Sequence, residues 1–287
     1  MRARGIVLPL ARMRAAHLAV LLPFVFLAAC GGPLPAAPDP TVAPPVVAAP
    51  PAATPSAAPS ATLVPPPPAP EDDRSDADKA LDPGRHPTEM IAFFGIKPGQ
   101  HVAELGSGSG YTTELLARAV GPNGIVYGQN PKWLLEKFAE KPWSARLSKP
   151  AMANVTRLDR EFDDPFPADV KDLDAVISIL FYHDTVWLKV DRDKMNRAAF
   201  AALKHGGIYG IIDHSAQPGS GVRDVKTFHR IDEDFVKAEV LRAGFKLADE
   251  ANFLRNPADT RDWNDSPGAA AEKRGTSDRF VLKFVKP

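Results

Sequence analysis

The sequence predicts an α/β fold in which a mostly parallel, seven-stranded sheet is covered by helices on both faces. Short, almost entirely apolar runs alternate with longer segments of helical periodicity, a pattern typical of strands buried on both sides. A glycine-rich turn follows the first apolar run, at a place where parallel sheets commonly bind ligands. Residues 71–287 have an ordinary globular composition and are long enough for one sizeable core.

The first half of this region alternates two strands with two helices. Residues 101–105 form a short apolar run and are expected to be the first strand. Residues 112–120 carry leucine, alanine and valine on one side, as an amphipathic helix does. A Gly-Pro-Asn-Gly turn then leads into a second strand at 124–128. Residues 131–141 are expected to be a helix, because proline suits a first turn.

The second half continues the alternation. Residues 155–158 are a third strand, and the strongly apolar residues 173–180 are a fourth. A helix at 193–204 is expected to end at Gly206 and Gly207, since glycine readily closes helices. The remaining expected elements are a strand at 207–212, a helix at 233–243 closed by Gly244, and strands at 245–251 and 280–285.

The charges are unevenly distributed, although 35 basic and 35 acidic residues give a net charge of zero. Residues 1–30 carry four arginines and no acid, and residues 31–70 carry one charge, Asp39. The remainder is slightly acidic and has no Lys/Arg-rich face, which excludes a basic nucleic-acid binder. A single cysteine excludes a disulfide framework, and a single apolar run excludes a polytopic membrane protein.

Residues 1–29 are predicted to be a bacterial export signal. A basic stretch precedes about 12 largely apolar residues, too few to span a bilayer core of about 30 Å. The run ends in Leu-Ala-Ala-Cys, which resembles the lipobox of bacterial lipoproteins, and this resemblance implies a lipid on Cys30. Gly31 after the cysteine then indicates the outer membrane, facing the periplasm. The alternatives are a plain anchor or a cleaved signal, and Met13 is a second candidate start.

Residues 30–70 are predicted to be a disordered tether. Fifteen of the 30 prolines lie in residues 31–70. Proline donates no amide hydrogen and fixes φ, so neither helix nor sheet propagates. As polyproline II, at roughly 3.1 Å per residue, the segment would reach on the order of 120 Å from a membrane. A proline-rich ligand for a partner domain is the alternative.

The sharpest motif is the glycine-rich turn Glu-Leu-Gly-Ser-Gly-Ser-Gly at residues 104–110. Glycines let the backbone turn tightly and let a ligand approach where no Cβ stands in the way. The following helix start offers free N–H groups. The spacing is G-x-G-x-G, and Tyr111 stands where a dinucleotide fingerprint needs its third glycine. The spacing therefore disfavours a nicotinamide oxidoreductase.

The turn resembles motif I of class I methyltransferases that use S-adenosylmethionine, and the resemblance covers about residues 85–287. It implies a Rossmann-like sheet with an antiparallel last strand, and S-adenosylmethionine as cofactor. Where the family has a ribose-binding acid, this chain has Asn130, which carries no charge. Asp159 matches the position near the adenine amine. The residues expected to bind the cofactor are Glu104, Gly106, Ser107, Gly108, Gly110, Asn130 and Asp159.

A closer resemblance is to an uncharacterised group of predicted bacterial methyltransferases that share two further motifs. Here the motifs are Tyr182-His183-Asp184, after the fourth strand, and His229-Arg230-Ile231-Asp232, directly before the helix expected at 233–243. Asp232 also suits the N-cap of the helix that follows.

Candidate catalytic residues follow the fourth and fifth strands, because ligands of open α/β sheets bind beyond the carboxyl ends of the strands. Methyl transfer to oxygen or nitrogen needs a base, and histidine has a suitable pKa, near about 6.5. We expect His183 to be the base and His214 to be the second candidate, with helix capping or loop hydrogen bonding as the alternative roles. The catalytic candidates are Tyr182, His183, Asp184 and His214.

A metal site is the weaker alternative at the same strand ends. Asp184, Asp213 and His214 would imitate the Mg²⁺ ligands of catechol-type methyltransferases, but an imidazole is unusual beside Mg²⁺. The sequence analysis therefore expects no metal ligand.

Two functions follow from these predictions. The favoured one is an exported lipoprotein enzyme that transfers a methyl group from S-adenosylmethionine to a small or envelope-associated acceptor. The alternative keeps the fold without catalysis, as a ligand-binding or scaffold lipoprotein, because S-adenosylmethionine is made in the cytosol and Asn130 carries no charge. The sequence indicates neither the methyl acceptor nor the oligomeric state.

Overall fold

A computed structural model describes residues 73–287. The expected signal peptide, the expected tether and Cys30 lie outside these described residues and stay predictions. Within residues 73–287, no helix combines the length and the apolar character that a membrane span requires.

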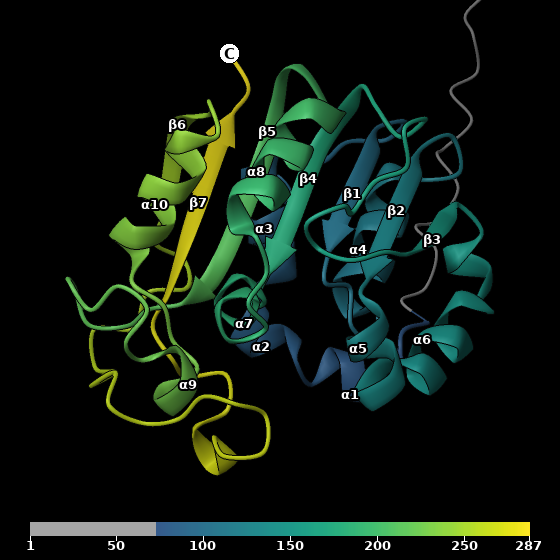
Figure 1. The fold of residues 1–287 in the computed structure, drawn as a ribbon. Helices are drawn as coiled ribbons and strands as arrows, with labels where there is room; N and C mark the ends of the chain where they lie inside the picture. The colour runs from purple at the N-terminus through teal and green to yellow at the C-terminus, as the bar shows by residue number, and fades with distance from the viewer. Residues whose placement is uncertain (1–72) are drawn as a thin grey trace, which may run out of the picture. The chain divides into compact units, whose positions relative to one another are not determined.

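A seven-stranded sheet forms the centre of the described chain, with the strand order β3-β2-β1-β4-β5-β7-β6 (Figure 1). Neighbouring strands are parallel except at β7, which pairs antiparallel with β5 on one side and β6 on the other. The predicted mostly parallel sheet with an antiparallel last strand is thereby confirmed. The strands are β1 (His101–Leu105), β2 (Ile125–Asn130), β3 (Val155–Asp159), β4 (Leu173–Ile179), β5 (Leu203–His214), β6 (Lys246–Ala251) and β7 (Arg279–Val285).

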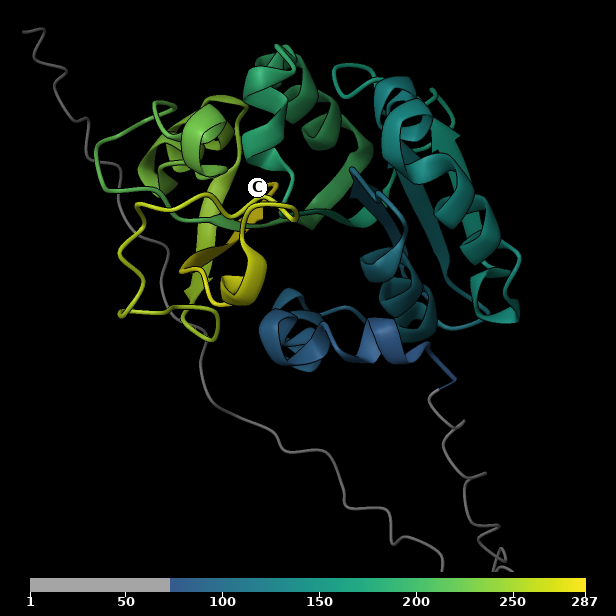
Figure 2. The same cartoon turned by 90° about the horizontal axis from the view of Figure 1, so that it is seen from below.

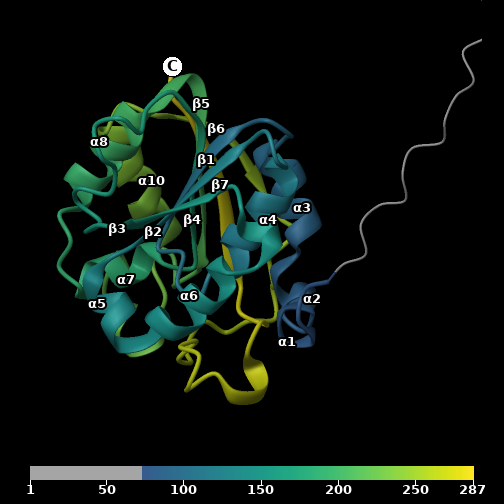
Figure 3. The same cartoon turned by 90° about the vertical axis from the view of Figure 1, so that its right-hand side faces the viewer.

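Helices cover both faces of this sheet, as Figure 3 shows along the plane of the strands. On one face lie α3 (Pro87–Phe94) and α4 (Tyr111–Val120), and on the other lie α8 (Arg192–Ala202) and α10 (Glu233–Arg242). Burying an aliphatic or aromatic side chain between such layers contributes about 1.5–3 kcal/mol. Fully buried core side chains include Val102, Leu105, Leu116, Val176, Ile177 and Phe284.

The helix expected at 131–141 is longer and less regular than predicted. It starts as α5 (Lys132–Leu134), widens into the π-helical turn η1 (Leu135–Ala139) and continues as α6 (Glu140–Leu147). Pro142 lies inside this helix and has no amide hydrogen to offer the preceding turn. The missing hydrogen bond gives a physical reason for the wider turn just before it.

The helix expected at 193–204 ends earlier than predicted, because the sheet begins earlier. Its last residue is Ala202, and the next residue, Leu203, is already extended, buried and paired with Leu173 of β4. Gly206 does not close the helix but lies within β5 with a φ of 74°, between residues whose register with β4 shifts. Burial of Leu203 in the sheet outweighs its local preference for helix.

Several helical elements have no counterpart in the sequence prediction. Elements of one or two turns show little periodicity and depend on tertiary packing for their stability. Besides α3 they are α1 (Asp76–Lys79), α2 (Asp82–Arg85), α7 (Tyr182–Trp187), α9 (Val225–Phe228), η2 (Pro150–Met152) and η3 (Ala271–Lys273).

Buried ion pairs fasten α1 to α4 and α6. The guanidinium of Arg146 lies 2.8 Å from Asp78 of α1 and 2.5 Å from Glu114 of α4. Lys149 adds a second cation 2.8 Å from Glu114, whose side chain is fully buried. Because an uncompensated buried charge is costly, this cluster ties the first described helix to the helical layer beside the sheet.

The carboxyl ends of the parallel strands point to the lower edge of the sheet in Figure 1, and Figure 2 looks at this edge directly. From β1 the chain builds outward through β2 to β3, and then returns to place β4 on the other side of β1. Open α/β sheets bind ligands at such a reversal of strand order, beyond the strand ends. The glycine-rich turn follows β1, so the structure places it at this reversal.

Candidate functional site

The glycine-rich turn is built from three glycines in the left-handed region of backbone conformation. The φ angles of Gly106, Gly108 and Gly110 are 74°, 56° and 85°. A Cβ on Gly106 would lie 2.7 Å from the Phe181 ring, and one on Gly110 would lie 2.4 Å from the Trp143 ring. A Cβ on Gly108 would meet no atom within 4 Å. Gly108 is therefore where a ligand can approach the backbone of the turn.

Glu104 lies at the base of the turn, 2% exposed, near the end of β1. It accepts a hydrogen bond from the Thr113 hydroxyl of α4. Burial raises the pKa of this carboxyl to about 7, against the opposing effect of the hydrogen bond from Thr113. Glu104 is thus a buried acid two residues before the first glycine of the turn.

Two amide side chains from the end of β2 hold the turn in shape. Gln129 accepts a hydrogen bond from the Gly106 N–H at 3.1 Å. Asn130 accepts one from the Gly108 N–H at 2.7 Å and donates one to the Gly108 carbonyl at 3.1 Å. Both amides are fully buried. The structure therefore gives Asn130 a role in fastening the turn, where the sequence analysis expected it to contact the cofactor.

Asp159 lies at the same edge, opposite Asn130 in the pairing of β2 with β3. Its side chain is 49% exposed and forms an ion pair of 2.7 Å with Arg157 on its own strand. The structure thus places Asp159 near the expected end of the site, with its carboxylate already partnered.

The Tyr182 side chain belongs to the core, whereas its sequence neighbours His183 and Asp184 form a polar cluster. Its hydroxyl donates to Glu239 of α10 at 3.0 Å and accepts from Asn196 of α8 at 2.8 Å. The side chain is fully buried, and burial together with the charge of Glu239 raises the pKa of the phenol well above its ordinary value. The expected catalytic role of Tyr182 is therefore not supported by its position, because its polar atom is engaged between two helices.

His183 lies between two carboxylates at the start of α7. Its Nδ1 is 2.7 Å from Asp213 Oδ1 at the end of β5, and its Nε2 is 3.2 Å from Asp184 Oδ1. Burial opposes a charge on this ring, but the carboxylates of Asp213 and Asp184 outweigh it and raise the pKa of His183 to about 10. A protonated imidazole cannot accept a proton, so this environment disagrees with the expected role of His183 as general base.

His214 has the opposite environment. Its Nδ1 lies 2.5 Å from Asp265 Oδ2 and 2.9 Å from the Ser277 hydroxyl. Burial lowers the pKa of His214 to about 4 despite the Asp265 carboxylate, so the ring is neutral at pH 7. With a proton on Nδ1, beside the Asp265 carboxylate and the Ser277 hydroxyl, Nε2 carries the lone pair. Of the two predicted bases, His214 is the one able to accept a proton, although only as a weak base.

His229 joins the cluster from a distant part of the sequence. It follows α9, its ring centroid lies 5.0 Å from that of His183, and its Nε2 lies 3.5 Å from Asp184 Oδ1. From the sequence, His229 is only a member of a motif and has no predicted chemical role. Only the motif could have indicated such a role, because no local sequence pattern shows that α7 and α9 pack together.

The two other polar residues of the same motif are structural. Arg230 is fully buried, lies 2.7 Å from Asp259 and stacks its guanidinium 4.5 Å from the centroid of the Trp263 ring. Asp232 accepts a hydrogen bond from the Asp234 N–H, which confirms the expected N-cap of α10. Together they hold the segment that carries His229.

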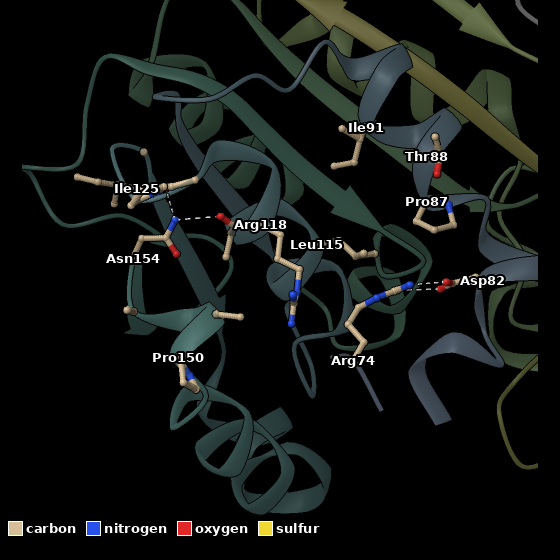
Figure 4. Close-up of a pocket in the computed structure, with 16 residues that line it drawn as sticks. Arg74, Asp82, Pro87, Thr88, Ile91, Leu115, Arg118, Ile125, Pro150 and Asn154 are labelled. Atoms are coloured by element: carbon tan, nitrogen blue, oxygen red, sulfur yellow. Dashed lines mark hydrogen bonds and ion pairs between the residues drawn. The ribbon is translucent and has the colours of Figure 1, made fainter. Parts of the chain in front are cut away.

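A separate groove of ≈ 1020 Å³ lies along α3 and α4 (Figure 4). Pro87, Thr88 and Ile91 of α3 form one wall, and Leu115 and Arg118 of α4 lie opposite. None of the residues that the sequence analysis assigned to cofactor binding or catalysis lines this groove. It is thus distinct from the site at the strand ends.

Solved structures with the same architecture come from several proteins. A SAM dependent methyltransferase from Aquifex aeolicus aligns with a TM-score of 0.51 at 18% identity, covering 74% of this chain and 97% of its own. A putative sarcosine dimethylglycine methyltransferase from Galdieria sulphuraria aligns with a TM-score of 0.53 at 15% identity, covering 75% of this chain and 89% of its own. The fold is a Rossmann-like class I methyltransferase fold.

The class I methyltransferase fold does not by itself fix a reaction. The [4+2]-cyclase SpnF has it too, with a TM-score of 0.51 at 15% identity over 71% of this chain and 80% of its own. Function must therefore be argued from the site.

Sequence similarity points to methyltransferases in particular. The profile of the protein-L-isoaspartate(D-aspartate) O-methyltransferase family matches residues 84–155, which include the glycine-rich turn and β2. The ubiquinone/menaquinone biosynthesis C-methyltransferase UbiE of Vibrio parahaemolyticus is 31% identical over 144 residues, which are 48% of this chain and 52% of UbiE. UbiE of Vibrio campbellii matches to the same extent. The chain thus spans about half the length of the curated relatives it matches.

Proposed function

We propose that this chain is a methyltransferase that uses S-adenosylmethionine and acts on a small or envelope-associated acceptor. The observation that carries the proposal is the turn between β1 and α4, which is open at Gly108 and follows the buried acid Glu104. Both the matching family profile and the UbiE relatives are methyltransferases by name.

The residues of the turn fit the methionine part of the cofactor better than its ribose. The first N–H groups of α4, at the end of the turn, favour the polar, partly anionic end of such a ligand. At the expected ribose position, in contrast, the Asn130 amide is already hydrogen-bonded to the N–H and the carbonyl of Gly108. Bound S-adenosylmethionine supplies an electrophilic methyl group. The part played by the protein is to orient an acceptor and, for oxygen or nitrogen acceptors, to take up its proton.

His214 is our candidate for that proton acceptor, in place of His183. It is neutral at pH 7, lies at the end of β5 and is held by Asp265 through Nδ1. His214→Asn should lower the rate of S-adenosylhomocysteine release with cell-envelope extract by about 10²–10⁴-fold, a typical contribution of a general base. Binding of S-adenosylmethionine should be unchanged. An unchanged rate would exclude His214 as the base.

Calorimetric titration of the purified chain with S-adenosylmethionine and S-adenosylhomocysteine tests cofactor binding. Gly108→Val should abolish binding, because its side chain would fill the open side of the turn. Gly99→Val is the matched control: Gly99 has a φ of 83° and no atom within 4 Å of its Cβ position, but lies outside the turn. Equal loss in both variants would mean that backbone strain, and not the site, is responsible. No binding by the unaltered chain at millimolar ligand would refute the proposal, and binding without turnover would support an inactive module.

We also propose that the chain is an exported lipoprotein held at the bacterial outer membrane by a lipid on Cys30. The proposal is supported by the lipobox-like sequence before Cys30 and by the proline-rich residues that follow it. Cys30→Ser should leave unprocessed precursor, visible as a larger band without incorporated fatty acid. Normal processing of Cys30→Ser would contradict the proposal.

A further inference from the structure

We propose that His183, Asp184 and His229 form a binding site for a divalent transition-metal ion of the Zn²⁺, Mn²⁺ or Fe²⁺ class. Each of the three residues offers one ligand atom, and these atoms lie within 4.8 Å of one another. The proposal goes beyond methyl transfer and does not depend on it.

The first argument is that ring nitrogens of two histidines converge on one carboxylate, and that one of these nitrogens is buried without a partner. His183 is 2% exposed, and its Nε2 has no hydrogen-bond partner, although it lies 3.2 Å from Asp184 Oδ1. The Nε2 of His229 lies 3.5 Å from the same oxygen. Buried polar atoms without partners are rare in folded proteins. Asp184 Oδ1 also accepts a hydrogen bond from Trp187 Nε1 at 2.6 Å. A cation bound by both nitrogens and this carboxylate would give His183 Nε2 the partner that it lacks.

The second argument is the support behind His183. Asp213 Oδ1 lies 2.7 Å from the Nδ1 of this ring, and Asp213 Oδ2 accepts the His183 backbone N–H at 2.7 Å. The His214 backbone N–H also donates to Asp213, at 2.8 Å. Histidines that bind metals commonly donate their other ring nitrogen to a carboxylate, which fixes the ring and directs Nε2 toward the metal. The cation would take the place of the proton on Nε2, because metal binding releases protons from its ligands.

The third argument is the backbone of His229. Its φ of 55° and ψ of 47° lie in the left-handed region, which is unfavourable for a residue with a side chain. The next residue, Arg230, is fully buried against Asp259, and the Ile231 N–H donates to the His214 carbonyl at 3.0 Å. The surrounding structure therefore imposes this conformation, as it often does at functional sites.

The donor set indicates the kind of metal. Two imidazoles and one carboxylate are typical ligands of Zn²⁺, Fe²⁺ and Mn²⁺, whereas Mg²⁺ prefers oxygen. Three protein ligands also leave a position for water or a substrate, as catalytic sites do. The set differs from the Mg²⁺ alternative of the sequence analysis, because Asp213 supports His183 from behind and His214 turns its Nδ1 to Asp265.

The test is metal binding by the full chain carrying Cys30→Ser, which removes the sole thiol. After dialysis against a chelator, addition of Zn²⁺ should restore one tightly bound equivalent, measured by elemental analysis, and Co²⁺ should give visible absorption bands of nitrogen and oxygen ligation. His229→Asn should weaken binding at least 100-fold, because asparagine tolerates the left-handed backbone but removes the imidazole. Asp213→Asn should weaken it by about 10–100-fold.

His205→Ala is the matched control, because His205 is exposed at the start of β5 and bonds only the carbonyl of Pro287. Its affinity for Zn²⁺ should equal that of the unaltered chain. Unchanged stoichiometry and affinity in His229→Asn would overturn the proposal, as would the absence of stoichiometric binding of Zn²⁺, Mn²⁺ and Fe²⁺ at micromolar concentration. Circular dichroism of each variant separates loss of the site from loss of the fold.

Discussion

The side chain of Asn130 holds both backbone polar groups of Gly108, accepting from its N–H at 2.7 Å and donating to its carbonyl at 3.1 Å. An amide can do both, whereas a carboxylate only accepts. The uncharged residue at a position where class I methyltransferases usually have an acid therefore has a structural explanation: the turn needs a donor there.

Asn130→Asp should destabilise the protein by about 1–3 kcal/mol, because the Gly108 carbonyl loses its donor and faces a buried charge. Urea unfolding measures the change. Asn264→Asp is the control, since Asn264 only accepts, from the Ser266 N–H. Tighter binding of S-adenosylmethionine by Asn130→Asp, with unchanged stability, would show that this position does face the ribose.

Glu104→Gln should make stability less dependent on pH. The pKa of Glu104 is raised from 4.5 to about 7 in the folded chain, so the fold binds this proton more tightly than the unfolded chain does. Its contribution is fully present below about pH 4.5 and is lost as the pH rises to about 7, a loss of about 3 kcal/mol. Unfolding at pH 5 and pH 8 should show this loss in the unaltered chain and in the exposed control Glu136→Gln. Its persistence in Glu104→Gln would contradict the assignment.

Arg146→Met should cost about 3 kcal/mol, because it leaves Asp78 and the buried Glu114 short of a cation. The free energy of unfolding in urea checks this value. Arg160→Met removes an exposed pair with Asp164 and should change stability by less than about 1 kcal/mol. Similar losses in both variants would argue against a special role for the buried cluster.

His229→Gly should separate metal binding from folding. Glycine adopts the left-handed conformation freely, so the metal-free variant should gain about 1 kcal/mol of stability while losing the imidazole. Lys189→Gly, at a residue with a φ of 60°, should gain as much and keep its affinity for Zn²⁺. Thermal unfolding in chelator and Zn²⁺ titration give the two readouts. Full affinity in His229→Gly would remove this residue from the ligand set.

Central strands such as β4 (Leu173–Ile179) could be predicted because they are nearly continuous apolar runs, and burial on both faces requires that pattern. The helices α7 and α9 could not, because six residues or fewer show no useful periodicity. These helices carry His183 and His229 near their ends. The position of the most polar part of the site could therefore not be predicted from local sequence patterns. The sequence named His183 correctly as part of a polar cluster, but its protonation depends on Asp213, thirty positions away.

The position of β7 has a consequence for how the protein can be made. β5 and β6 do not pair with each other, and β7 lies between them although it follows both in sequence. A polypeptide stopped before Arg279 would therefore lack a central member of the sheet and not a dispensable edge, leaving β6 with no neighbour. Assembly of this region must wait until β7 has been synthesised, so a polypeptide that stops before β7 yields material open to proteolysis and aggregation.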